Sequence, residues 1–216
     1  MTITAILGID LSGPTNTKDT VAAAFKPVKG GLTCTDIITE GGDGQILSLA
    51  EKLNASGTLA VGLDAPLSYN PGGGDRPADR QLRQTLTRVG LKSGTIMPPT
   101  MNRMVYLTLR GMALARMLET VCTDVFIAEI HPAGAMALRK APAADVRNLK
   151  SDQEARARLL AWMTAQGLSG IEKKKDISDH YVAACAAALG IWHLASGTPA
   201  WRFAPEPPFH PFNVAC

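Results

Sequence analysis

Residues 2–10 read TITAILGID and residues 59–64 read LAVGLD, and these two stretches decide the fold class. Each begins as a near-continuous apolar run, which is typical of a strand covered on both faces of a sheet. Each run ends on an aspartate, Asp10 after residues 2–9 and Asp64 after residues 59–63. A buried carboxylate without a compensating partner costs several kcal/mol of desolvation. The pattern therefore predicts that something neutralises these two acids.

Further acids lie at the ends of apolar segments. Glu129 closes the apolar run at residues 125–128, and Asp176 and Asp179 open an alanine-rich helix. Hard cations take oxygen ligands and need only a few protein carboxylates, because water or a substrate phosphate fills the remaining positions. We therefore expect a Mg²⁺ or Mn²⁺ site. The alternative is that each acid is a turn residue, half of an ion pair or a helix cap; for the last helix, Asp176 would be the N-cap and Asp179 would lie in the first turn.

Composition predicts one soluble, globular domain. The chain has 216 residues, of which 46% are hydrophobic and 19% are charged, enough for one large core. Its longest apolar stretch, residues 181–194, is too short to span a bilayer, and the N-terminus shows no secretory signal. The four cysteines lie far apart and form no zinc-binding spacing. We expect a cytoplasmic protein with reduced cysteines and no membrane partner.

Positive charge is concentrated between residues 70 and 116, where eight basic residues accompany two acids. Arginine forks hold phosphate bidentately, so a basic segment beside an acidic metal site favours nucleic acid or another phosphate-containing substrate. Arg76, Arg80 and Arg83 recur at helical spacing soon after the second apolar strand. We expect them to lie over the site and bind substrate. The alternative is an ordinary solvated helix face.

Hydrophobic periodicity and turn residues predict the order β-β-β-α-β-α-β-α. The first three strands are antiparallel, and a helical crossover leads to two parallel strands. We expect a single domain over residues 1–216, with a helical insertion at about 66–122 and an extended, proline-rich tail at about 203–216. The predicted strands are 2–9, 20–26, 32–39, 59–63 and 124–129, and the predicted helices are 44–54, 77–89, 102–121, 151–166 and 177–195.

This α/β order, with acids after the first, fourth and fifth strands and on the last helix, resembles the ribonuclease H-like fold over about residues 2–195. A narrower resemblance is to domain-of-unknown-function family four-twenty-nine, described as predicted ribonuclease H-like nucleases. The motifs that carry this second resemblance are GIDLS (8–12), GLDAPLS (62–68), RPADRQLR (76–83), EIHPA (129–133) and DISDHYVAACAAA (176–188).

The resemblance implies roles for individual acids. Asp10 would be the first-strand aspartate that contacts both metal ions, and Asp64 the acid that ends the fourth strand. Asp176 and Asp179, spaced D-x-x-D, resemble the last-helix acids of the Holliday-junction-resolvase branch of the superfamily. These four acids are the expected metal ligands. No acid on the predicted helix at 44–54 matches the ribonuclease H glutamate, which favours the resolvase-like arrangement.

The implied function is a metal-dependent nuclease or phosphodiesterase-type hydrolase that cuts nucleic acid by a two-metal mechanism. Its catalytic acids would be Asp10, Asp64, Asp179 and Glu129, the last an extra acid from the fifth strand. Two other functions stay open. GIDLSGPTNT at residues 8–17 resembles the phosphate-binding hairpin of sugar kinases and actin-like ATPases, which favours a nucleotide-binding phosphotransferase. The other is a non-catalytic nucleic-acid-binding domain.

Three uncharged or weakly basic residues accompany the acids. We expect Ser12 and His131 to contact substrate. His131 and His180 each lie next to a proposed catalytic or metal-binding acid in the sequence, and we expect them to assist proton transfer or to contact phosphate. The alternative for each histidine is a structural role, which is more common for a lone histidine.

Overall fold

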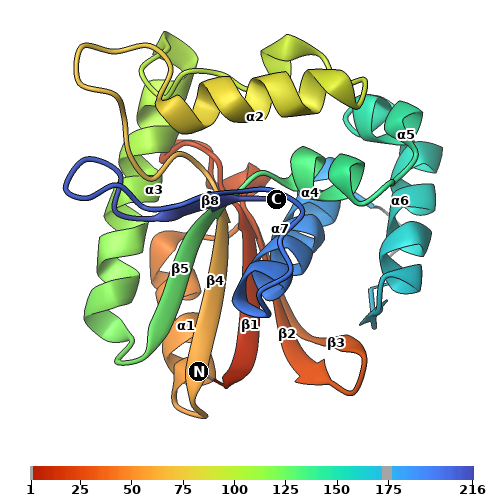
Figure 1. The fold of residues 1–216 in the computed structure, drawn as a ribbon. Helices are drawn as coiled ribbons and strands as arrows, with labels where there is room; N and C mark the ends of the chain where they lie inside the picture. Colours follow the sequence, from red (N-terminus) through yellow and green to blue (C-terminus); the bar gives the residue numbers. More distant parts are fainter. Residues whose placement is uncertain (1, 172–176) are drawn as a thin grey trace.

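The computed structural model describes residues 2–171 and 177–216 as one mixed sheet with helices on both faces (Figure 1). The strands are β1 (Ile3–Asp10), β2 (Val21–Val28), β3 (Gly31–Thr39), β4 (Thr58–Asp64), β5 (Val125–Ile130), β6 (Leu168–Ser169), β7 (Arg202–Phe203) and β8 (Asn213–Ala215). The helices are α1 (Asp43–Asn54), α2 (Pro77–Arg88), α3 (Asn102–Val121), α4 (Pro132–Leu138), α5 (Ala143–Asn148), α6 (Gln153–Ala165) and α7 (Asp179–Ala195), with short 3-10 turns η1 (Thr17–Asp19) and η2 (Ser93–Thr95).

The strand order across the sheet is β6-β3-β2-β1-β4-β5-β8-β7. β1 pairs antiparallel with β2, and β2 antiparallel with β3. On its other side β1 pairs parallel with β4, and β4 parallel with β5. Three antiparallel strands followed by two parallel ones, in the order 3-2-1-4-5, form the core of the ribonuclease H-like fold. The fold prediction is confirmed.

The predicted number of strands is wrong, because the sheet has eight strands and not five. The additional strands β6, β7 and β8 contain only two or three residues each. Alternation cannot be recognised in runs of that length. β8 pairs parallel with β5 and antiparallel with β7, so the tail, expected to be extended, also contributes strands to the sheet edge. Helices α4 and α5, of seven and six residues, were likewise not predicted.

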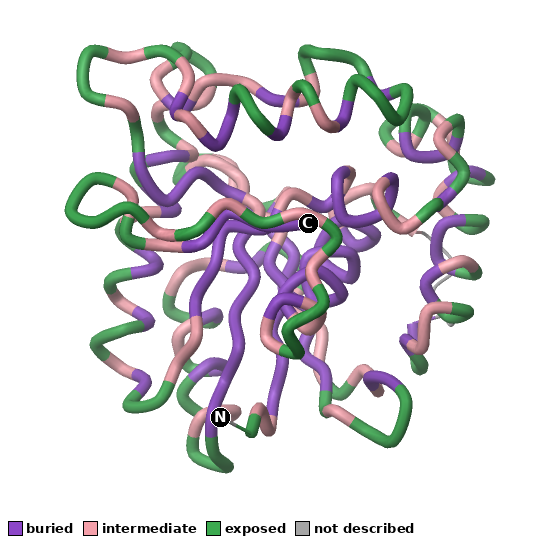
Figure 2. The backbone as a smooth tube through the Cα atoms, in the orientation of Figure 1, coloured by how far each residue is buried: buried purple, intermediate pink, exposed green. Residues whose placement is uncertain are grey.

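Two hydrophobic cores lie on the two faces of the sheet. One packs α7 and the helices α4 to α6 against β1, β2, β4 and β5, and the other packs α1 and α3 against the opposite face. Figure 2 shows the central strands buried along most of their length, as their apolar runs predict. Within the described residues, no helix is long and apolar enough to cross a membrane.

The α7 helix lies unusually close to the sheet because two glycines leave room for its backbone. A Cβ atom at Gly8 of β1 would collide with the backbone of Ala184 and Ala188, and one at Gly62 of β4 would lie 2.8 Å from the carbonyl oxygen of Ala187. Each glycine stands two residues before a strand-ending aspartate. This close packing holds the start of α7 beside those aspartates, at the carboxyl ends of β1 and β4.

The α2 helix crosses above the carboxyl ends of the central strands (Figure 1). Leu82 and Leu86 on its inner face are buried in the α7-side core. The α2 helix therefore lies over the carboxyl ends of the strands that carry Asp10 and Asp64, while both aspartates stay partly exposed to solvent.

A candidate carboxylate centre at the sheet edge

Asp10 and Asp64 lie side by side at the ends of parallel strands. They are paired residues in the β1–β4 register, so their side chains point to the same face of the sheet. Gly8 and Gly62 are also paired, two residues earlier on that face, where α7 packs. Strand periodicity therefore explains the repeated Gly-x-Asp pattern: the glycine admits α7, and the aspartate faces its first turn.

His180, in the first turn of α7, is the residue closest to Asp10 in that turn. Its Nδ1 lies 2.6 Å from Asp10 Oδ2, and its Nε2 lies 3.9 Å from both Asp19 Oδ1 and Asp179 Oδ1. The helix is capped by Ser178, whose hydroxyl accepts a hydrogen bond from Tyr181 N at 3.1 Å. Asp179 thus lies in the first turn, and the N-cap is Ser178 and not Asp176.

Burial makes the two strand-ending carboxylates hard to ionise. Desolvation raises the pKa of Asp10, although hydrogen bonds with His180 and Asp64 partly oppose the rise. Desolvation and the neighbouring Asp10 charge raise the pKa of Asp64 well above its usual range. The hydrogen bond to Asp10 raises the pKa of His180. Two adjacent acids with raised pKa values form a site that a cation would stabilise.

Glu129 belongs to a different cluster. It is paired with Leu63 in the β4–β5 register, so alternation directs its side chain to the face opposite that of Asp64. There its carboxylate oxygens accept hydrogen bonds from Arg76 at 2.6 and 2.7 Å and from Leu67 N at 2.9 Å. Glu129 is already neutralised by the protein itself.

Arg76 is a buried anchor. Its side chain is 3% exposed and also binds Asp79 at 2.8 and 3.0 Å and the carbonyl and hydroxyl oxygens of Ser68. All five guanidinium N–H groups face acceptors. Arg76 therefore has no free donor for the phosphate that it was expected to bind.

The other two arginines that were expected to bind substrate, Arg80 and Arg83, do not line the cleft with the aspartates. Arg83 is paired with Asp75, with Nη2 at 2.7 Å from Oδ1, and also donates to the carbonyl of Ile96. This pairing lowers the pKa of Asp75. Arg80 is exposed and donates to the Asp75 carbonyl at 2.8 Å. The three arginines therefore do not form one shared surface over the acids.

Ser12 and His131 line the cleft but take part in internal hydrogen bonds. Ser12 Oγ contacts Asn16 O at 2.5 Å and Thr20 Oγ1 at 2.6 Å. His131 Nδ1 accepts a hydrogen bond from Gly134 N at 3.0 Å and so caps α4, and burial lowers the pKa of its ring. These contacts explain both residues as local structural elements.

Arg110 of α3 holds the loop that follows Asp10. It is buried and donates to Ser12 O, Thr20 Oγ1 and the Gly41 carbonyl at 2.8–3.0 Å, and its Nη2 lies 2.7 Å from Asp43 Oδ1. The sequence placed Arg110 only in the general basic segment. Its partners lie 67 to 98 residues away along the chain, so no local pattern identifies this role.

The acids line a cleft of about 360 Å³. Asp10, Asp64 and Asp179 contribute to it, and the Arg76–Glu129 pair also lies in its wall. Asp19 and Lys150, which the sequence analysis did not single out, line it as well. Lys150 is exposed, its ammonium group makes no hydrogen bond or ion pair with the described residues, and its charge lowers the pKa of Asp64. It follows the short helix α5, which periodicity did not reveal, so no sequence signal marked it.

The fit of a divalent ion can be judged from these donors. Within residues 2–171 and 177–216, no three His, Cys, Asp or Glu residues are already grouped as metal ligands. Asp176, an expected ligand, lies outside the described residues. Asp10 and Asp64 nevertheless form an adjacent pair of carboxylates, to which no described lysine or arginine is ion-paired. Mg²⁺ is commonly held by one or two carboxylates with water and substrate oxygens, so the donor set fits this ion.

Comparison with known proteins places the chain in a family. Among solved structures, the chain is similar to T. thermophilus RuvC in complex with a Holliday junction substrate. The two sequences are 10% identical, the TM-score is 0.39, and the match covers 90% of this chain and 96% of that chain. No curated protein gives a significant match. Residues 8–208 match the family model described as "Protein of unknown function (DUF429)". The match covers most of the chain, and the protein therefore belongs to the DUF429 family.

Proposed function

We propose that this protein is a metal-dependent nuclease that hydrolyses phosphodiester bonds at the Asp10–Asp64 centre. The observation that carries the proposal is that these two carboxylates are paired at the carboxyl ends of β1 and β4 in a ribonuclease H-like sheet, where burial raises the pKa of both. Such a pair is unfavourable for an apo protein and favourable for a cation site. The proposed ions are Mg²⁺ or Mn²⁺, and the proposed substrate is a nucleic acid.

Each residue near the proposed centre has a distinct task. Asp10 and Asp64 would hold the metal, with Asp179 and Asp176 completing the carboxylate set from the start of α7. When bound, two divalent ions supply an activated water and stabilise the leaving oxygen of the phosphodiester. His180 holds the Asp10 carboxylate through the 2.6 Å contact and so fixes its orientation. Glu129 is assigned to the anchor of α2 instead of the chemistry, because Arg76 already neutralises it.

Cleavage assays test this proposal directly. The wild-type protein is incubated with labelled single-stranded, duplex, hybrid and junction substrates, with Mg²⁺, Mn²⁺ or EDTA. We expect cleavage of at least one substrate that requires the metal ion and is lost in Asp10→Asn and in Asp64→Asn. Glu51→Gln, an exposed carboxylate on α1, serves as the matched control and should cleave like the wild type.

Absence of cleavage on every substrate and with both metals would contradict the proposal. Metal-dependent cleavage that survives in Asp10→Asn would contradict the assignment of the site. Circular dichroism of each variant shows whether a loss of activity follows from a loss of folding.

A further inference from the structure

The carboxylate cleft is enclosed on several sides. Its apolar wall contains Leu82 of α2, Met97 of the following loop, Leu107 of α3, and Pro132 and Ala183 from α4 and α7. A volume of about 360 Å³ lies in the range of sites that hold one small ligand. The cleft therefore has room for a unit about the size of one nucleotide, with an apolar wall suited to the flat face of a base and acids suited to metal-bound phosphate.

The cover over this cleft is firmly held. Arg76, at the start of α2, is joined to Glu129 of β5 at 2.6 Å and to Asp79 at 2.8 Å, all in a buried environment. Breaking either contact would leave a buried charge without a partner. Because α2 is anchored in this way, it forms a fixed wall of the cleft, which favours entry of a single unpaired nucleotide over the intact backbone of a double helix.

One cation in the cleft is free to bind an anion. The ammonium group of Lys150 makes no hydrogen bond or ion pair with the described residues, and Lys150 lines the same cleft as Asp10 and Asp64. Its backbone is held in place by Arg156, which donates to Leu149 O, Lys150 O and Ile177 O at 2.9–3.2 Å. An ammonium group at this position suits a backbone phosphate.

A second groove, of about 680 Å³, is lined by part of the same loop as the first cleft. Ala65 and Pro66 line the carboxylate cleft, and the next residues of the same loop, up to Tyr69, line the groove. Its far wall comes from the C-terminal loop, including Phe209. Ser68 Oγ joins the two loops through its 2.9 Å contact with His210 Nδ1.

The groove presents aromatic rings to solvent. Tyr69 is 51% exposed and Phe209 is 63% exposed, and Arg116 of α3 lies at the rim beside Glu119. Figure 1 shows the β4–α2 loop, α3 and the C-terminal loop together on one side of the molecule. Exposed aromatic side chains beside a cation are the features on which successive bases of a single strand stack.

We infer that the substrate is single-stranded nucleic acid: one unpaired nucleotide enters the carboxylate cleft beside Lys150, and neighbouring bases stack on Tyr69 and Phe209. The inference rests on the proposed function for the chemistry, but it makes its own statement about binding. It follows from the loop at residues 65–69, whose residues line both grooves, and from the nucleotide-sized volume of the carboxylate cleft.

Binding measurements separate this inference from the nuclease proposal. The probes are a fluorescein-labelled single strand of mixed sequence and the same strand annealed to its complement, measured by anisotropy with Ca²⁺ in place of Mg²⁺. We expect the wild type to bind the single strand more tightly than the duplex. Tyr69→Ala combined with Phe209→Ala should weaken single-strand binding at least about fivefold, the loss expected for one stacked base.

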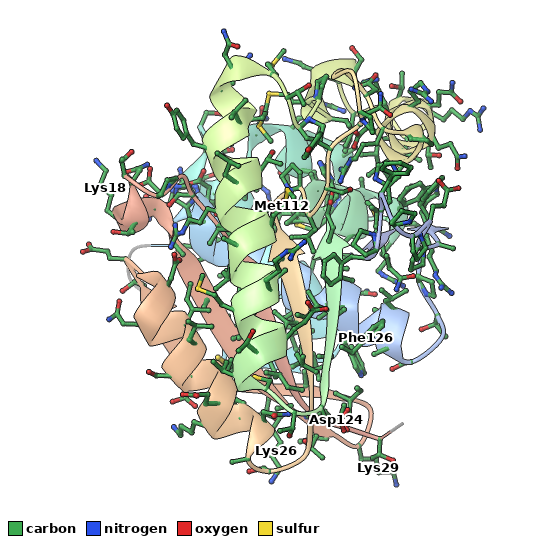
Figure 3. All side chains as sticks on the ribbon, turned by 90° about the vertical axis from the view of Figure 1, so that its left-hand side faces the viewer. Lys18, Lys26, Lys29, Met112, Asp124 and Phe126 are labelled. Atoms are coloured by element: carbon green, nitrogen blue, oxygen red, sulfur yellow. The ribbon has the colours of Figure 1, made fainter. Side chains whose placement is uncertain are left out.

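Matched controls make these effects specific. Tyr106→Ala removes a tyrosine that is 68% exposed but lines neither groove, and it should bind like the wild type. Lys150→Gln should lower the slope of log affinity against log salt by about 0.7, the value for one phosphate contact on a single strand. Lys29→Gln should leave the slope unchanged, because Lys29 lies in the turn between β2 and β3, at the opposite end of these strands from the cleft. Figure 3 labels Lys29 far from Lys18, which is the neighbour of the cleft residue Asp19.

The possible outcomes are distinct. Metal-dependent cleavage with equal or tighter duplex binding, or with groove variants that bind like the wild type, would overturn the single-strand inference and leave the nuclease proposal standing. Single-strand binding that requires Tyr69, Phe209 and Lys150, without cleavage in any metal, would support the inference and overturn the nuclease proposal. Absence of both binding and cleavage would overturn both.

Discussion

Two acidic clusters lie next to each other at the carboxyl ends of the central strands. They differ in how far neighbouring side chains neutralise their negative charge. In the first, Asp10 and Asp64 face α7, and His180 contacts Asp10 from the first turn of that helix. In the second, Glu129 and Asp79 share the buried guanidinium of Arg76. The first cluster has more negative charge than the described residues compensate, and the second is complete.

The difference separates a place for a ligand from a structural anchor. A buried acid with an internal arginine partner gains nothing from a cation and contributes to holding α2. Acids whose pKa values are raised by burial and by each other gain from any cation that reaches them. Four experiments test whether the two clusters differ in this way, and the one with the greatest expected change in stability is given first.

Arg76→Ala should give the largest change. It leaves two buried carboxylates without their partner, and removal of one member of a buried ion pair typically costs about 3–5 kcal/mol. Chemical denaturation measures the free energy of unfolding. Arg80→Ala on the exposed face of the same helix is the control and should change it by less than about 0.5 kcal/mol. Equal effects of the two substitutions would show that the second cluster is not an anchor.

Mn²⁺ should stabilise the folded wild type by about 2.7 kcal/mol at a concentration 100 times the dissociation constant, because it binds the native state selectively. Asp10→Asn should abolish the accompanying rise in melting temperature, and Glu51→Gln should retain it. Differential scanning calorimetry with and without metal measures both. A full rise in Asp10→Asn would locate the metal outside the first cluster.

Gly8→Ala should disturb the first cluster and spare the second. The new Cβ meets the backbone of α7, and overpacking of this kind costs about 1–3 kcal/mol. It should also displace His180 from Asp10, which NMR of the imidazole detects. Gly44→Ala, at a helical site with open space, should instead be neutral or stabilising. Gly8→Ala with wild-type stability and His180 signals would contradict the close packing of α7.

Asp64→Asn should stabilise the metal-free protein, with an effect on the order of 1 kcal/mol, or about 2–4 °C in melting temperature for a chain of this size. The sign follows from linkage. The pKa of Asp64 is higher in the folded chain than its usual value. In the pH range between the usual and the folded pKa, the folded state binds more protons than the unfolded state, so the wild type loses stability as pH rises through this range. The stability advantage of Asp64→Asn should therefore be full above this pH range and absent near pH 4 and below. Melting curves across this pH range measure it, and an advantage confined to acidic pH would contradict the raised pKa.

Much of the fold was accessible from sequence because its signals are local. The apolar runs that end at Asp10 and Asp64 are long enough to identify buried strands, and the alanine-rich segment at 179–195 is a buried helix as its composition indicates. The short elements α4, α5 and β6 to β8 were missed, since a run of two to seven residues contains too little periodicity. Lys150 was missed with them.

Residue order alone predicts that acids lie at the ends of buried strands and that a basic segment follows the strand that ends at Asp64. Which of those charges neutralise each other depends on how the chain folds. Arg76 reaches Glu129 across 53 residues of chain, and the pleat directs Glu129 and Asp64 to opposite faces although they close neighbouring strands. Partnership between charges depends on distance in space and on burial, and neither can be read from spacing along the chain.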